Sequence, residues 1–117
     1  MSELYRRMQP FLGDETELIR RMAGRMDLWE ECVALFPGAE IITETDEALQ
    51  TGDDTALYGV VHRLKGNLAN FGFDRAAQVA MDVLQAIKEK DRERIKHYYT
   101  ELREQYLQIA ERLGEAE

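Results

Sequence analysis

The sequence is short of several features, and each shortage excludes a class of protein. Cys32 is the only cysteine, so no disulfide can form within the chain. No apolar run approaches the length of a membrane span, and the first residues lack the apolar segment of a signal peptide. We therefore expect a cytoplasmic protein without a membrane segment, because unpaired cysteines persist in a reducing compartment.

Positive charge is also scarce. Lys and Arg total 15 against 23 Asp and Glu, which gives a formal net charge of −8. Nucleic acids and anionic membrane surfaces both attract basic faces, so we expect neither as a partner. The sequence contains no glycine-rich phosphate loop and no Cys/His cluster at metal-ligand spacing. We therefore expect no nucleotide or metal site, and no free-standing enzyme.

Signals for β-strands are missing as well, which favours an all-α fold. Only two prolines occur, and apolar residues recur every three or four positions without sustained alternation. A chain of 117 residues suits one domain spanning 1–117. Four long amphipathic segments predict an up-down-up-down four-helix bundle with one or two short additional N-terminal helices. The helices are expected near 3–11, 15–24, 27–36, 38–50, 54–71, 74–89 and from 91 onward.

Local signals mark several helix ends. Asp14 and Asp27 are each followed by a glutamate three positions later, which is the pattern of a capping box at a helix start. Pro37 interrupts the chain, although it could also be the first residue of the following helix. Gly72 is well placed to end a helix in the left-handed conformation. Cys32 is expected to be a small core residue.

The second of the long helices carries a histidine on its outer face. Its apolar residues form one buried seam, made of Leu57, Val61, Leu64, Leu68 and Phe71. His62 then points about 140° away from the centre of the seam, towards solvent. Its neighbours three, four and seven positions away are Gly59, Gly66 and Ala69, so the ring should stand on a surface with few side chains. Lys65 lies on the flank, within reach of the same space.

A glycine inside a helix needs a reason. Gly66 costs about 0.5–1 kcal/mol relative to alanine, which suggests that something is gained by keeping this surface bare. We interpret the gap as clearance that lets another protein bring a phosphoryl group to His62. A neutral imidazole is a nucleophile, and phosphoryl transfer is catalysed mainly by positioning and charge neutralisation. Lys65 can supply one cation, and a metal ion would have to come from the partner.

These residues resemble the signature of histidine-containing phosphotransfer (HPt) domains of two-component phosphorelays. The resemblance covers residues 52–89 and rests on a Gly-Asp turn followed by His62, Leu64, Lys65, Gly66, Ala69, Phe71 and Gly72. HPt domains are helical bundles whose histidine accepts a phosphoryl group from an aspartyl-phosphate on a receiver domain, or from a histidine kinase. They pass it to another receiver.

The resemblance assigns roles and partners. It implies that His62 is the phosphoacceptor, that Lys65 stabilises the phosphate charge, and that Gly66 provides clearance. It also implies a response regulator receiver domain, a sensor histidine kinase, or both as partners, with Mg²⁺ expected on the receiver. We expect the partner-binding surface to include Gly59, Arg63, Gly66 and Ala69, and we expect a monomer.

The sequence departs from the family pattern on the second motif helix. Many members carry an acidic residue at the position of Met81, and some carry a glutamine at the position of Leu84. Here Asp82 and Gln85 lie one position further on. An alternative therefore stays open, a helical docking or inhibitory module that carries no phosphate. A helical ligand or metal carrier is a third reading, although His97 is too distant in sequence to form a recognisable site with His62.

Overall fold

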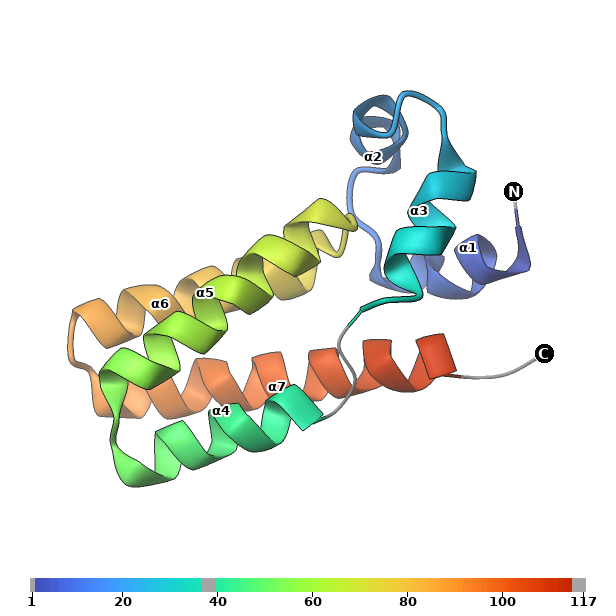
Figure 1. Ribbon diagram of the computed structural model, residues 1–117. Helices are drawn as coiled ribbons and strands as arrows, with labels where there is room; N and C mark the ends of the chain where they lie inside the picture. The colour runs from blue at the N-terminus through green and yellow to red at the C-terminus, as the bar shows by residue number, and fades with distance from the viewer. Residues whose placement is uncertain (1, 37–39, 115–117) are drawn as a thin grey trace.

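The computed structural model describes residues 2–36 and 40–114, and these form α-helices and one 3-10 turn without a strand (Figure 1). Four helices run alternately up and down as a bundle: α4 (Glu40–Thr51), α5 (Asp54–Asn70), α6 (Asp74–Lys88) and α7 (Arg92–Gly114). Shorter elements precede them: α1 (Glu3–Met8), η1 (Gln9–Phe11), α2 (Glu15–Arg21) and α3 (Met26–Val33). The predicted all-α bundle is confirmed, although within the described residues three short α-helices and one 3-10 turn precede it, more than the one or two helices predicted. Within the described ranges, no helix is both long and apolar enough to cross a bilayer.

Most helix ends follow the local signals. The Asp14 carboxylate accepts the Glu17 backbone N–H at 3.0 Å and caps α2. Gly72 has φ +85° and ends α5, as predicted. Asp27 was wrongly expected to cap α3, because that helix begins one residue earlier and Asp27 instead bonds Arg25 at 3.3 Å. The expectation for Pro37 lies outside the described residues.

The seam of α5 forms the centre of the hydrophobic core. Its predicted members Leu57, Val61, Leu64 and Leu68 are fully buried, and Phe71 is partly buried at the end of the helix. They pack against α6, whose inner face is buried throughout: Ala76, Val79, Ala80, Val83 and Ile87. Cys32 was expected in the core but is exposed. The reason is that Trp29 and Val33 share the inner side of α3, one turn apart, and turn Cys32 outward.

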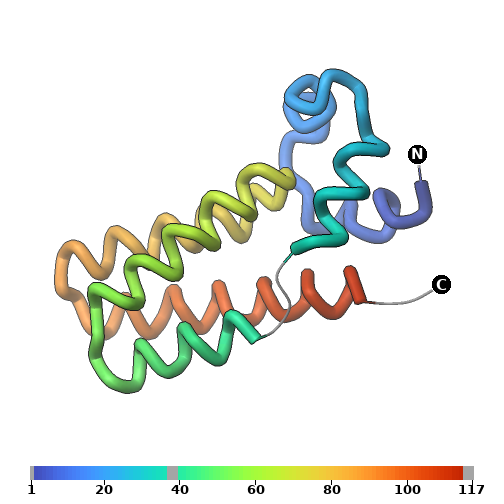
Figure 2. Tube along the Cα trace, viewed as in Figure 1, coloured from blue at the N-terminus to red at the C-terminus, as the bar shows by residue number. Residues whose placement is uncertain are grey.

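The N-terminal helices are fixed to the turn between α5 and α6 (Figure 2). The Gly13 N–H donates to the Gly72 carbonyl at 2.9 Å, and the Trp29 indole N–H donates to the Phe71 carbonyl at 3.0 Å. Arg21 donates to the last carbonyl groups of α5. A Cβ atom on Gly13 would collide with the first residue of α6, so only glycine allows this close approach. The carbonyl groups at the C-terminal end of α5 therefore accept the hydrogen bonds that join this helix to the N-terminal helices.

Candidate functional site

His62 lies on the outer face of α5, and its side chain is exposed, as the helical period predicts. The ring is stacked on Tyr58, with ring centroids 6.2 Å apart and an angle of 18° between the planes. Side chains of a helix lean towards its N-terminus, so a ring meets the residue four positions earlier. We did not expect Tyr58 as a neighbour from the sequence, although it lies four positions before His62. The surface around His62 is thus bare on one side only.

The open side is provided by glycine. A Cβ atom built on Gly59 or on Gly66 would meet no atom within 4 Å in the described part of the chain. Close helix packing therefore does not explain Gly66. Ala69, further along the same face, is half-buried against the edge of the core. The space beside the imidazole is open to an incoming group, as the clearance interpretation requires.

His62 and Lys65 line a hollow of about 320 Å³ between α5 and α6, which we call the His62 hollow. Its other lining residues are Tyr58 from α5 and Met81, Leu84, Gln85 and Lys88 from α6. The neighbouring helix α6 therefore contributes polar groups to the hollow that His62 lines. They come from Gln85 and Lys88, whereas Met81 is 48% exposed at the hollow and Leu84 is only 6% exposed. Positions three, four and seven apart share a helix face. The spacing of Met81, Leu84, Gln85 and Lys88 therefore indicates in the sequence that these four residues lie on one face of α6.

The His62 hollow carries uncompensated positive charge. Lys65 is half-buried and Lys88 is exposed, and neither forms an ion pair with any described residue. The Lys88 Nζ lies 5.9 Å from the centroid of the Tyr58 ring. The Glu89 carboxylate, next to Lys88 in sequence, accepts hydrogen bonds from Arg94 at 2.9 Å and from the Gln85 side chain at 3.1 Å, and it forms no ion pair with Lys88. In a chain of net charge −8, two unpaired ammonium groups beside one imidazole form a local site for an anion.

Arg63 does not belong to this hollow. Its guanidinium lies over α4, 3.3 Å from the Glu44 carboxylate, and both side chains are largely exposed. Exposed ion pairs of this kind contribute little stability, and the Glu44 carboxylate neutralises the charge of Arg63. The structure thus brings together His62, Lys65 and the open space at Gly66, and it places Arg63 on a different side of α5. Participation of Arg63, Gly59 and Ala69 in partner binding stays a prediction.

The second histidine does not line the His62 hollow. His97 on α7 is exposed and meets the ring of Tyr98 edge-on, with centroids 5.1 Å apart. No group of three or more His, Cys, Asp or Glu side chains within residues 2–36 and 40–114 is arranged to hold a metal ion.

Comparison with protein-family models identifies the class. The model of the Hpt domain matches residues 37–113, which include α4 to α7 and the His62 hollow. The chain therefore belongs to the Hpt domain family, and the resemblance seen in the sequence is confirmed. Comparison with curated proteins and with solved structures finds no match. The family is that of phosphorelay carriers that interact with receiver domains or kinases of two-component systems. Helices α1 to α3 lie outside the matched residues.

Proposed function

We propose that this chain is a phosphocarrier in which His62 accepts a phosphoryl group from the aspartyl-phosphate of a receiver domain, or from a histidine kinase, and passes it to another receiver. One observation carries the proposal: an exposed imidazole stands at an open hollow that also holds two unpaired lysines. A lone pair of the imidazole forms the N–P bond while the P–O bond to the aspartate breaks, and the carboxylate stays on the receiver. The reverse step returns the group to a second receiver.

The lysines have a defined task in this reaction. The transferring group carries its charge on three equatorial oxygens, and catalysis depends on neutralising them in place. Lys65 from α5 and Lys88 from α6 line the same hollow from two helices, so they can approach the group from different directions. The stack with Tyr58 restricts the orientation of the His62 ring before the partner arrives. We expect Mg²⁺ to be held by the receiver.

Two further features belong to the same proposal. The reaction needs one exposed histidine and one receiver at a time, so a monomer suffices. A cytoplasmic location agrees with a chain whose only cysteine, Cys32, is exposed and unpaired.

A docking module without phosphate transfer is the second candidate. The exposed Met81 at the edge of the hollow favours it, because an apolar side chain there can contact a partner without taking part in chemistry. This candidate predicts tight binding to a receiver or kinase and no covalent label on the chain.

The deciding experiment is transfer of radiolabelled phosphate from a panel of phosphorylated receivers. We expect the wild type to acquire label that is labile in acid and stable in alkali. His62→Gln should abolish labelling while circular dichroism stays unchanged, because the side chain is exposed. His97→Gln is the matched control and should be labelled like the wild type. Labelling of His62→Gln at the wild-type rate would falsify the assignment of His62 as the phosphoacceptor. Binding of the wild type to a receiver or kinase without any label on the chain would establish the docking module.

A further inference from the structure

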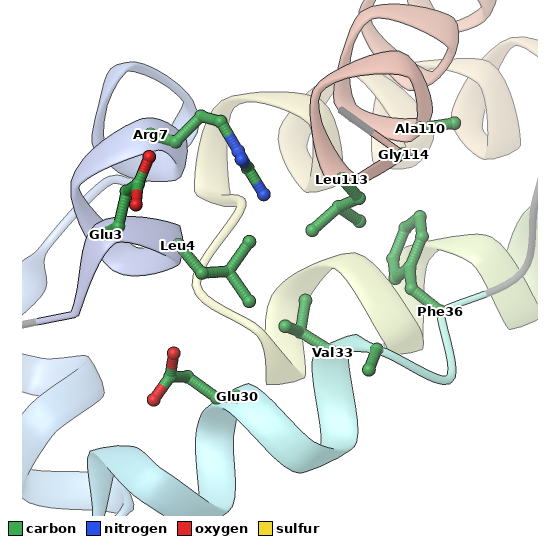
Figure 3. A pocket seen from close by; sticks show the side chains of 10 residues that line it. Glu3, Leu4, Arg7, Glu30, Val33, Phe36, Ala110, Leu113 and Gly114 are labelled. Atoms are coloured by element: carbon green, nitrogen blue, oxygen red, sulfur yellow. The ribbon is translucent and has the colours of Figure 1, made fainter. Parts of the chain in front are cut away.

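A second hollow, larger than the first, lies where α1 and α3 meet the C-terminal end of α7 (Figure 3). Its volume is about 590 Å³, within the range of about 300–1,000 Å³ typical of sites for small molecules. It shares no lining residue with the His62 hollow. Most of its lining residues precede the residues matched by the family model. We call it the α1–α3–α7 hollow.

The wall of this hollow is mainly apolar. The apolar lining residues are Leu4, Val33, Ala34, Phe36, Ala110 and Leu113. Figure 3 shows the side chains of Leu4, Phe36 and Leu113 directed towards the common space. Water in such a space gains few hydrogen bonds, so an apolar ligand body would be favoured over solvent there.

One cation points into the apolar space. The Arg7 side chain extends from α1 towards Leu113 (Figure 3), and its Nε atom is buried without a hydrogen-bond partner. Arg7 forms no ion pair with a described residue, although Glu3 and Glu30 line the same hollow. A buried donor without an acceptor is unfavourable, and the planar guanidinium fork matches a carboxylate with two parallel hydrogen bonds.

We propose that the α1–α3–α7 hollow binds an apolar monocarboxylate, a compound with one carboxylate and a hydrocarbon body. The carboxylate would accept hydrogen bonds from Arg7, and the hydrocarbon would contact Leu4 and Leu113. The carboxylates of Glu3 and Glu30 at the same hollow repel a second negative charge, which disfavours dicarboxylates and phosphate esters. This site is independent of the chemistry at His62, and its test needs no phosphotransfer.

The test is calorimetric titration of the full chain with three matched probes. Decanoate supplies one carboxylate, decanol replaces it with a neutral hydroxyl, and decanedioate adds a second carboxylate. We expect saturable one-to-one binding of decanoate, with decanol and decanedioate each bound about tenfold more weakly, as expected for loss of a charge-assisted bond or for charge repulsion. Equal affinity for decanoate and decanol, or no saturable binding of decanoate, would overturn the proposal.

Variants locate the site. Arg7→Gln should remove the preference for decanoate over decanol, whereas Arg6→Gln should keep it, because Arg6 is exposed and does not line the hollow. Ala110→Trp should fill the space and abolish binding of all three probes. An unchanged preference in Arg7→Gln would refute the assignment. The comparison of probes on the wild type decides the matter even if Ala110→Trp does not fold.

Discussion

The surfaces around the two histidines are alike in several respects. His62 and His97 are both exposed, and each ring lies beside a tyrosine, at 6.2 and 5.1 Å between centroids. In both places a cation lies near the tyrosine ring: Lys88 at 5.9 Å and Arg94 at 5.7 Å. Exposure, an aromatic neighbour and a nearby cation therefore do not distinguish a phosphoacceptor from an ordinary surface histidine.

Unpaired lysine side chains and open space do distinguish the surroundings of His62 from those of His97. Arg94 is held by Glu89, whereas Lys65 and Lys88 have no acidic partner among the described residues. Glycines stand three positions before and four positions after His62 and leave open space, while Arg94 and Glu101 occupy the corresponding positions around His97. The comparison teaches that a site for an incoming phosphoryl group is defined by what its neighbours leave unoccupied and unpaired.

Filling the free space should have the largest effect. Gly66→Phe places a ring where a Cβ atom meets nothing, so the fold should persist while the partner is held away from His62. A displacement of about 1 Å can slow a positioned reaction about 100-fold, so we expect a rate loss of that order in single-turnover transfer. Glu101→Phe, which adds the same ring beside His97, is the control and should transfer normally. Wild-type kinetics for Gly66→Phe would refute the clearance argument.

Removing the free charges should have an intermediate effect. Lys65→Gln and Lys88→Gln each delete one cation from the His62 hollow, and each should slow transfer about tenfold, in the range expected for one charge-assisted hydrogen bond. Lys96→Gln removes the cation that precedes His97 in the sequence, which does not line the His62 hollow, and should change nothing. Rates measured at increasing salt should fall less steeply in the two hollow variants than in the wild type. If only Lys65→Gln is slow, the role of Lys88 is disproved.

Loosening the histidine ring should have the smallest effect. Tyr58→Ala removes the stack and should slow transfer about threefold, consistent with the 0.5–1.5 kcal/mol typical of an aromatic pair. Tyr58→Phe keeps the ring and should retain the wild-type rate and the ring-current shift of the His62 proton signals. Tyr98→Ala, the corresponding change beside His97, should leave transfer intact. A slow Tyr58→Phe variant would show that the hydroxyl, and not the stack, matters.

The parts of the fold that follow from helical period could be predicted from the sequence. Leu57, Val61 and Leu64 recur at spacings of three and four, which fixes both the buried seam of α5 and the outward direction of His62. Gly72 ends the helix because its left-handed conformation is strained for other residues, and this signal is local. Both predictions depend on one helix and its immediate ends.

The features that the sequence did not disclose depend on how helices meet. Lys88 reaches the His62 hollow only because α6 packs beside α5, and the resemblance to the family pattern directed attention to Met81 and Leu84 instead. Cys32 was misplaced because α3 is short and most of its residues are apolar, so its sequence leaves the inner face ambiguous until Trp29 docks. The α1–α3–α7 hollow joins residues from the two ends of the chain, which no local pattern brings together.

The attachment of the N-terminal helices has a practical consequence for anyone who shortens this protein. Several of their hydrogen bonds with the bundle are accepted by main-chain oxygens, including those of Phe71 and Gly72, so a fragment cut to residues 37–113 would expose these oxygens to water. It would also uncover Phe73, which is fully buried in the intact chain. Expression boundaries drawn from the family match alone would therefore invite aggregation, and a soluble fragment should begin before Tyr5.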